Sequence, residues 1–345
     1  MTQNLTERQK LILALVIRDY IESAKAVSSE HLVSYYRMDV SPATVRNELL
    51  ALTEMGYLRQ MHTSAGRVPT EEGYRYFVRQ LMGHADLPVN TKRTIIHQFY
   101  QAGLDVDRWM RLAASVLAHQ AQAASLVTAP HTEQPHFKHL ELINTRGRQV
   151  LMVLVLSGGE VSQQMLTLAE PVTQEQLSDA ARILNGMCQG LSAEMIANLS
   201  APASALEQDI LNLIVDEMRR ASQTLTGELY HDGITHVLAE PEFGEVELAR
   251  RALRILEERP LLEDLLNRTV LSSDLGGVQV LIGGEGNWEE LRDCSIVLAR
   301  YGAPGLATGT LGVLGPMRMA YGRTISTVRF VAGLLSDLVE EKLLE

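Results

Sequence analysis

The chain has 345 residues, of which 46% are hydrophobic and 21% charged, a balance typical of a folded globular protein and not of a disordered one. Its net charge is −11 at pH 7, but residues 1–82 hold ten Lys and Arg against nine Asp and Glu, which leaves −12 on residues 83–345. Because an acidic body repels DNA, any binding of nucleic acid must be confined to the N-terminal part.

The composition also indicates the cellular compartment. No apolar run reaches the ~18 residues of a membrane span, and no signal-peptide segment occurs at the N-terminus. The two cysteines, Cys188 and Cys294, lack metal-ligand spacing and are expected to be buried or idle thiols. We therefore expect a cytoplasmic protein of two or three domains with no membrane partner.

The first residues predict two helices. Thr6 and Gln9 match a capping box, and apolar residues recur at helical spacing as far as Tyr20, so a first helix is predicted over about 6–23. Ser28 or Ser29 can cap a short second helix, which leads by a tight connection to the next segment. This is the order of a helix-turn-helix.

The third predicted helix begins after Ser41, a good N-cap, because the following proline suits the first helical turn. At ~100° per residue, Val45, Leu49 and Leu52 share one face. The opposite side of the helix carries Ala43 and Asn47, flanked by Thr44 and Arg46. A short polar face of this kind suits the DNA major groove, because Asn can bond adenine, Arg can bond guanine or phosphate, and Thr or Ala can meet a thymine methyl.

A short hairpin is predicted next. Residues 57–61 form a strand, Gly66 supplies a turn, and residues 67–69 return as a short or edge strand, because Pro69 lacks an N–H. Thr70 then caps another helix. The turn gathers small polar groups and one cation, which suits phosphate contact, although a plain polar hairpin would look similar. The residues concerned are His62, Thr63, Ser64, Gly66 and Arg67. For His62, a DNA contact and a structural hydrogen bond both remain open.

The remainder of the chain, after a linker at 83–88, is a mixture of helices and strands. Predicted helices cover about 91–102, 106–123, 173–189, 192–199, 204–226, 244–257 and 261–267. Predicted strands cover 125–129, 140–144, 150–156 and 161–168, followed by a glycine-containing strand-rich segment at 278–315. The strands from 140 to 168 are separated by turn residues and predict an antiparallel meander.

No catalytic pattern stands out. His131, His136 and His139 lack a recognised zinc spacing, and the serine at 157 lacks the Gly-x-Ser-x-Gly elbow of acyl-transfer enzymes. The glycines between 302 and 315 match neither a dinucleotide nor a phosphate loop, so tight strand packing is the favoured interpretation. We expect no enzyme activity, no metal and no cofactor.

Two parts of the chain resemble one family. Residues 5–82 resemble the DNA-binding domain of the heat-inducible transcription repressors of the HrcA family. The matching segments are Leu5 to Gln9, Ser41 to Glu48, His62 to Thr70 and Gly73 to Tyr76. At the other end, Ile282 to Glu285 and Gly312 to Tyr321 are similar to the C-terminal signature of that family.

The resemblance implies an α+β protein with three domains. These are a winged helix-turn-helix over 1–82, a discontinuous GAF-like domain over 90–136 and 227–345, and an inserted dimerising domain with an antiparallel sheet and helices over 137–226. The GAF-like sheet is then expected from strands near 125–129, 235–239, 278–283, 294–301 and 308–315. Alternatively, the meander belongs to this main sheet.

The resemblance also implies a function. It implies a homodimeric repressor of heat-shock chaperone operons that binds an inverted-repeat operator in double-stranded DNA, with its activity maintained by the GroEL chaperonin. The residues expected at the DNA are Ser41, Ala43, Thr44, Arg46, Asn47, His62, Thr63, Ser64, Gly66 and Arg67. The alternative is a winged-helix regulator that senses a small molecule through its GAF-like domain.

Overall fold

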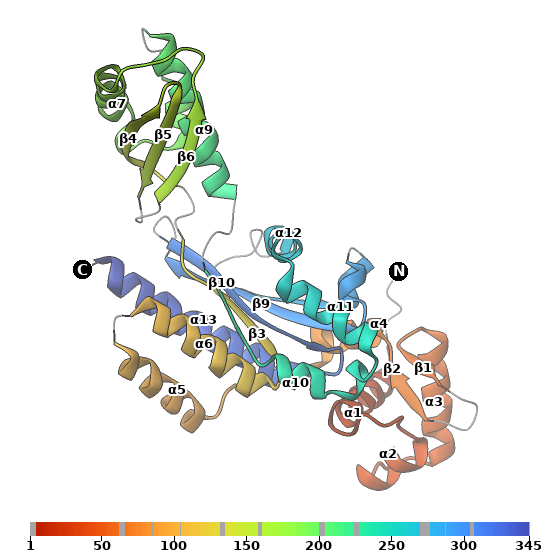
Figure 1. Ribbon diagram of the computed structural model, residues 1–345. Helices are drawn as coiled ribbons and strands as arrows, with labels where there is room; N and C mark the ends of the chain where they lie inside the picture. Colours follow the sequence, from red (N-terminus) through yellow and green to blue (C-terminus); the bar gives the residue numbers. More distant parts are fainter. Residues whose placement is uncertain are drawn as a thin grey trace. The chain divides into compact units, whose positions relative to one another are not determined.

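The computed structural model describes residues 5–61, 66–83, 86–103, 105–131, 135–157, 161–199, 204–223, 228–269, 277–286, 288–303 and 307–344. The contacts divide the chain into two compact units (Figure 1). The larger unit comprises Met1–Ala129, Leu229–Tyr301 and Thr310–Leu338, and the smaller unit comprises Pro130–Glu228, Gly302–Gly309 and Val339–Glu345. Helices and antiparallel sheets are both present, as an α+β fold requires.

The larger unit begins with three helices, α1 (Glu7–Ser23), α2 (Ser29–Tyr35) and α3 (Pro42–Glu54). The capping box of Thr6 is present, and Ser28 and Ser41 cap the other two helices, so these predictions are confirmed. The helices share a small apolar core, and α3 packs against both α1 and α2. Its members are Ile12, Leu13, Val16, Ile17, Leu32, Val45, Leu49 and Leu52.

A two-stranded antiparallel ribbon follows, formed by β1 (Leu58–Gln60) and β2 (Arg67–Pro69). Both strands are short, as expected from Pro69. Thr70 caps α4 (Glu71–Tyr76), which continues into a π-helix, η1 (Phe77–Leu81). The first part of the larger unit, residues 5–61 and 66–83, is called the N-terminal module below.

The main sheet has five strands in the order β7-β3-β10-β9-β8. Their bounds are Leu229–Asp232 for β7, Ala124–Thr128 for β3, Ala307–Pro316 for β10, Cys294–Ala303 for β9 and Val278–Ile282 for β8. The pairs β7/β3, β3/β10 and β9/β8 are antiparallel. Almost every residue of β9 and β10 is buried, so this sheet is covered on both faces.

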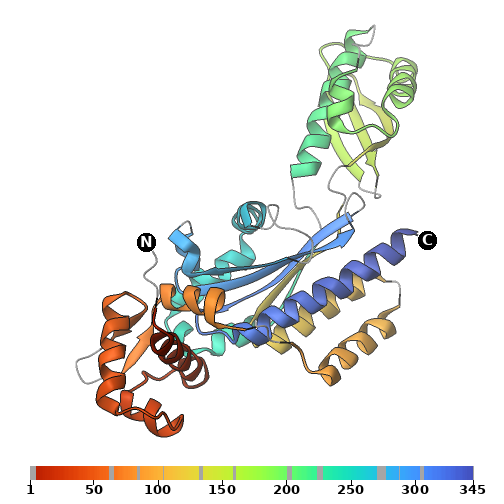
Figure 2. The ribbon, with the colours of Figure 1, turned by 180° about the vertical axis from the view of Figure 1, so that it is seen from behind.

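Helices cover both faces of this sheet (Figures 1 and 2). On one face lie α6 (Val106–Ala121) and the long α13 (Tyr321–Leu344), with α5 (Val89–Ala102) packed on α6. The other side carries α11 (Val246–Glu257) and α12 (Arg259–Thr269), preceded by α10 (Ile234–Ala239). Short 3₁₀ turns in the described residues are η2 (Pro241–Phe243), η3 (Gly283–Gly286) and η4 (Glu289–Leu291). Among the described residues, no helix combines the length and apolarity needed to cross a membrane.

Two expectations for this region were wrong or incomplete. The predicted strand at 235–239 is the helix α10, and the edge strand is β7, which ends just before Gly233. Gly233 has φ +75°, and an added Cβ would lie 2.4 Å from the carbonyl oxygen of Ala123, so the turn at this position requires glycine. Val237, which was expected on a strand, is a buried residue of α10. The long helix α13 was not predicted at all.

The smaller unit contains an antiparallel meander of its own, with strands β4 (Phe137–Arg146), β5 (Gln149–Leu156) and β6 (Val161–Thr167). The meander is confirmed, and the alternative that it belongs to the main sheet is wrong. The helices of this unit are α7 (Gln174–Cys188), α8 (Ala193–Ala197) and α9 (Ala205–Gln223). Their apolar residues form one core with one face of the sheet.

Candidate nucleic-acid interface

The helix α3 is held in place from one side. Val45, Leu49 and Leu52 are buried against the neighbouring helices. At the N-terminus, the Ser41 hydroxyl oxygen accepts a hydrogen bond from the Thr44 N–H at 3.1 Å and lies 2.9 Å from the Thr44 hydroxyl oxygen. The apolar contacts determine which face of the helix is buried, and the cap stabilises its first turn, so the opposite face is presented to solvent.

The outward face of α3 carries the residues that the sequence singles out. Ala43, Arg46 and Asn47 are exposed, and Thr44 is half-buried. The Arg46 guanidinium donates a hydrogen bond of 2.7 Å to the Glu30 carboxylate on α2. Because both partners of this ion pair are exposed, it contributes little to stability, and Arg46 can exchange Glu30 for a phosphate at low cost.

The ribbon is tied to the helices through β2. The backbone groups of Arg67 and Val27 exchange two hydrogen bonds, and the Arg67 Nε donates to the Thr53 hydroxyl at 3.0 Å. At Gly66 an added Cβ would lie 2.4 Å from the Val27 carbonyl oxygen, so the close approach of these segments requires glycine. The expected contacts His62, Thr63 and Ser64 lie outside the residues that the structure describes.

Further exposed groups lie on neighbouring elements of the N-terminal module. Tyr35 is exposed at the end of α2 and stacks on His31 with ring centroids 5.3 Å apart. Arg37, exposed with φ +51°, lies in the connection between α2 and α3, and Arg59 is exposed on β1. The sequence offers no signal for Tyr35, because only the fold decides which of Tyr35 and Tyr36 is the more exposed.

The N-terminal module rests on the two C-terminal segments that resembled the HrcA signature. Arg318 donates to the carboxylates of Glu240 and Glu242 and, at 3.4 Å, to the Ile21 carbonyl at the end of α1. Tyr321 packs against Tyr74 of α4 with ring centroids 6.0 Å apart. The two ends of the chain therefore meet in one buried contact.

A further hydrogen bond joins α4 to the end of β8. Arg75 of α4 donates to the Ile282 carbonyl oxygen at 2.8 Å and to the Glu71 carboxylate at 2.9 Å. Gly283 lies beside Glu71, where an added Cβ would come within 2.4 Å of the carboxyl carbon. Burial also raises the pKa of Tyr74 well above its ordinary value, so this phenol stays protonated. The position of the module on the main sheet is thus defined by specific polar contacts.

The histidines, the cysteines and the glycine-containing segment noted in the sequence form no catalytic arrangement in the described residues. Among the described residues, no group of three or more His, Cys, Asp or Glu could hold a metal ion. Burial raises the pKa of the Cys188 thiol to about 11 and that of Cys294 to about 12, and both thiols are free, as expected of buried cysteines. At Gly312 an added Cβ would lie 2.4 Å from the Val297 carbonyl oxygen, which confirms tight strand packing in place of a phosphate loop.

Comparison with known proteins gives a consistent result. Residues 107–325 match the family described as the HrcA protein C terminal domain. The heat-inducible transcription repressor HrcA of Roseiflexus castenholzii is 48% identical over 349 residues, which cover 99% of this chain and 96% of that protein. The repressors of the same name from Herpetosiphon aurantiacus and Dehalococcoides mccartyi are 45% and 34% identical, over 97% and 98% of this chain and 95% and 96% of theirs.

One solved structure shares the fold. A crystal structure of a hypothetical protein, described at 2.2 Å resolution, superimposes with a TM-score of 0.62 at 22% sequence identity. The match covers 98% of this chain and 100% of that one.

Proposed function

The chain belongs to the HrcA family of heat-inducible transcription repressors, and we propose that it represses chaperone operons by binding an inverted-repeat operator as a homodimer, with its N-terminal module acting as a winged helix-turn-helix. The observation that carries the proposal is α3, whose buried side is anchored and whose opposite face presents Ala43, Arg46 and Asn47. A helix so exposed fits the major groove, and the ribbon beside it brings Arg59 and Arg67 towards the flanking phosphates.

In this proposal the DNA surface comprises all the residues named from the sequence together with three that the structure adds. The first set is Ser41, Ala43, Thr44, Arg46, Asn47, His62, Thr63, Ser64, Gly66 and Arg67, and the added residues are Tyr35, Arg37 and Arg59. Asn47 and Thr44 are assigned to base edges, and Arg67 is assigned to a phosphate. The Ser41 hydroxyl, already engaged by Thr44, positions the helix N-terminus.

The test of base readout uses the full chain and a fragment carrying an inverted-repeat promoter element. Asn47→Ala should weaken operator binding by about 1–3 kcal/mol and leave binding to random DNA nearly unchanged. Asn90→Ala is the matched control and should change neither, because Asn90 is also exposed and lies in the first turn of α5. Equal losses on both DNAs would show that Asn47 does not read a base.

The test of phosphate contact is the salt dependence of binding. Arg67→Ala should weaken binding to operator and random DNA alike and flatten the plot of log affinity against log salt by about one phosphate contact. Arg108→Ala, which removes an exposed charge from α6, should leave the slope unaltered. An unchanged slope for Arg67→Ala would remove this residue from the interface.

An inverted-repeat operator has two-fold symmetry and is matched by a two-fold symmetric dimer. The smaller unit offers a surface for that dimer. One face of its sheet packs on the helices, whereas the other carries Leu151, Val153 and Val155 at its centre, all half-buried. The register places Leu151 beside Ile143 and Met165, which are 42% and 54% exposed. An open apolar sheet face of this kind is suited to pack against its own copy. We assign it to the dimer, and residues 137–226 to the dimerising domain.

In this proposal the GroEL chaperonin controls how much of the repressor is folded. When unfolded protein occupies GroEL after heat shock, a marginally stable repressor is no longer maintained, and transcription rises. Apolar strands such as β5 favour aggregation once they are exposed. On warming a few degrees above growth temperature, operator binding and soluble protein should fall together, and added GroEL should restore both. Loss of binding by protein that stays soluble, with unchanged circular dichroism, would instead favour the small-molecule sensor.

A further inference from the structure

Leu50 is an apolar side chain on the outward side of α3. It is 49% exposed, whereas its neighbours Leu49 and Leu52 are buried. At ~100° per residue, Leu50 lies ~20° from Ala43 and ~60° from Asn47 around the helix axis. It therefore belongs to the same face of the helix that is assigned to the major groove.

The residues of this face are also spaced along the helix. From Ala43 to Leu50 the helix rises ~10.5 Å, at ~1.5 Å per residue. The base pairs of DNA follow one another every ~3.4 Å, so this stretch spans about three of them. Leu50 lies one turn beyond Asn47, and the side chains of a helix lean towards its N-terminus. Leu50 is thus placed to reach a base pair close to the one that faces Asn47.

The carboxylates of α3 lie away from this stretch. Glu48 is turned to α1, where it accepts a hydrogen bond from the Gln9 side chain at 3.1 Å and pairs with Arg8 at 3.6 Å. Glu54 is the last residue of the helix, one turn beyond Leu50. Because carboxylates are repelled by the phosphates of DNA, the part of the helix before Glu54 is the part that suits the groove.

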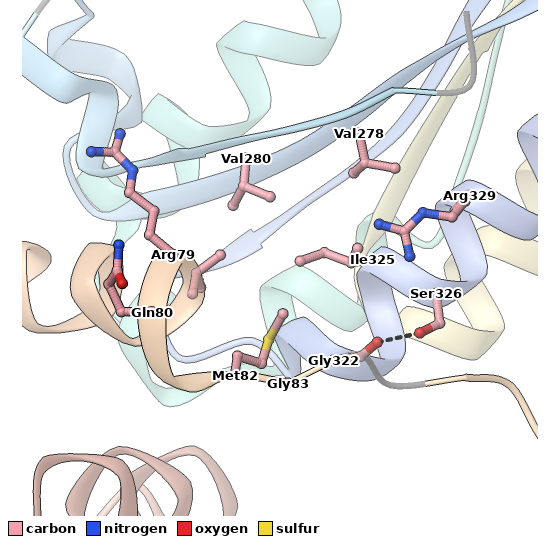
Figure 3. A pocket seen from close by; sticks show the side chains of 11 residues that line it. Arg79, Gln80, Met82, Gly83, Val278, Val280, Gly322, Ile325, Ser326 and Arg329 are labelled. Atoms are coloured by element: carbon pink, nitrogen blue, oxygen red, sulfur yellow. Dashed lines mark hydrogen bonds between the residues drawn. The ribbon is translucent and has the colours of Figure 1, made fainter. Parts of the chain in front are cut away.

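Other exposed apolar side chains of the N-terminal module lie on other elements. Leu11 is 53% exposed on α1, and Met61 follows β1. Met82, at the end of the module, lines a hollow of about 400 Å³ together with Val280 of β8 and Ile325 of α13 (Figure 3). Leu50 differs from all of these because it stands between polar residues that are assigned to DNA.

We propose that Leu50 reads a thymine, by packing against the C5-methyl group that this base presents in the major groove. Thymine alone among the four bases carries a methyl group there, and contact removes water from two apolar groups. Cytosine presents an amino group instead, which leucine would leave without a hydrogen-bond partner. This role of Leu50 rests on the proposed placement of α3 in the major groove and adds the base that this part of the helix selects.

The test removes the methyl group and nothing else. In the inverted-repeat promoter fragment, each thymine of one half-site is replaced in turn by uracil, which keeps the base pair. For the full-length parent protein, one such replacement should weaken binding about fourfold, the equivalent of ~0.8 kcal/mol for one buried methylene-sized group. In Leu50→Ala the same replacement should have no effect, because the partner of the methyl group is gone. Electrophoretic mobility gives the four affinities of this cycle.

Two further variants serve as controls. Leu50→Met keeps an apolar side chain of similar size and should retain the fourfold loss on uracil. Leu11→Ala removes an equally exposed leucine from α1 and should retain it as well. Circular dichroism should be the same for all variants, because both positions are exposed and Ala and Met are good helix formers.

An identical uracil penalty in Leu50→Ala and Leu11→Ala at every position would overturn the proposal, because any methyl contact would then belong to another residue, such as Ala43. A parent protein that binds the operator equally well after every replacement would overturn it too, while leaving the proposed function in place. If the parent protein does not prefer the inverted repeat over random DNA, both the proposed function and the role of Leu50 are wrong.

Discussion

The inner strands of the five-stranded sheet in the larger unit, β3, β10 and β9, are buried on both faces, whereas the described residues of the three-stranded sheet in the smaller unit are buried on one face only. Strands β9 and β10 are almost continuously buried, while β5 alternates between buried and half-buried positions. A sheet buried on two faces serves as a core, and a sheet buried on one face retains a surface for another molecule. The difference predicts that matched substitutions in the two sheets have different consequences.

The largest expected effect is on self-association. Val153→Glu places a charge at the centre of the open sheet face and should raise the dimer dissociation constant at least a hundredfold, because a carboxylate would be buried in the interface without a partner. Sedimentation velocity measures the change, and circular dichroism should stay the same. Met195→Glu, which charges an exposed position on α8, is the control and should remain dimeric. A dimer that persists in Val153→Glu would assign the interface to another surface.

A smaller effect is expected when the same atoms are exchanged in the two sheets. Val297→Thr in β9 buries a hydroxyl in a fully buried strand and should lower the free energy of unfolding by about 1–3 kcal/mol. In protein diluted until it is monomeric, Val153→Thr, half-buried on the open face of β5, should change it by no more than about 0.5 kcal/mol. Urea unfolding followed by circular dichroism gives both values. If the two substitutions cost the same, the open face is covered within the subunit.

The smallest effect concerns the two thiols, one in each region. Cys188 belongs to the core of the smaller unit, and Cys294 begins β9. Because burial raises the pKa of Cys188 to about 11 and that of Cys294 to about 12, both should remain protonated and react slowly with a thiol reagent at pH 8. On gentle warming Cys188 should react first, since its core lies under a sheet with an open face. Mass spectrometry of the labelled peptides shows which cysteine reacts first. Earlier labelling of Cys294 would show that the core of the larger unit opens more readily than that of the smaller unit.

Local signals in the sequence were enough for much of the N-terminal module and for the meander. Thr6, Ser41 and Thr70 each cap the helix that follows, because a cap depends on hydrogen bonds within three residues. The alternation in β5 and the turns on either side of it likewise act over a few residues. For the same reason the buried and exposed sides of α3 could be assigned before the fold was known.

Where partners lie far apart in the chain, the sequence pattern failed or was silent. Residues 235–239 resemble a strand, yet the chain turns at Gly233, where φ is +75° and the Ala123 carbonyl leaves no room for a Cβ, and continues as α10. The long helix α13 contains threonine and serine, which disfavour helices, but its apolar side is buried, and this tertiary packing outweighs the local preference.

The sequence by itself determined the caps, the periodicities and the identity of the polar side chains on α3, because these depend on neighbours within one or two turns. The tertiary structure alone decided that Arg46 pairs with Glu30, that Arg318 reaches the Ile21 carbonyl, and that η1, β8 and α13 line one hollow. Such contacts form only when hydrophobic burial brings distant segments together, and no local spacing encodes the resulting distance.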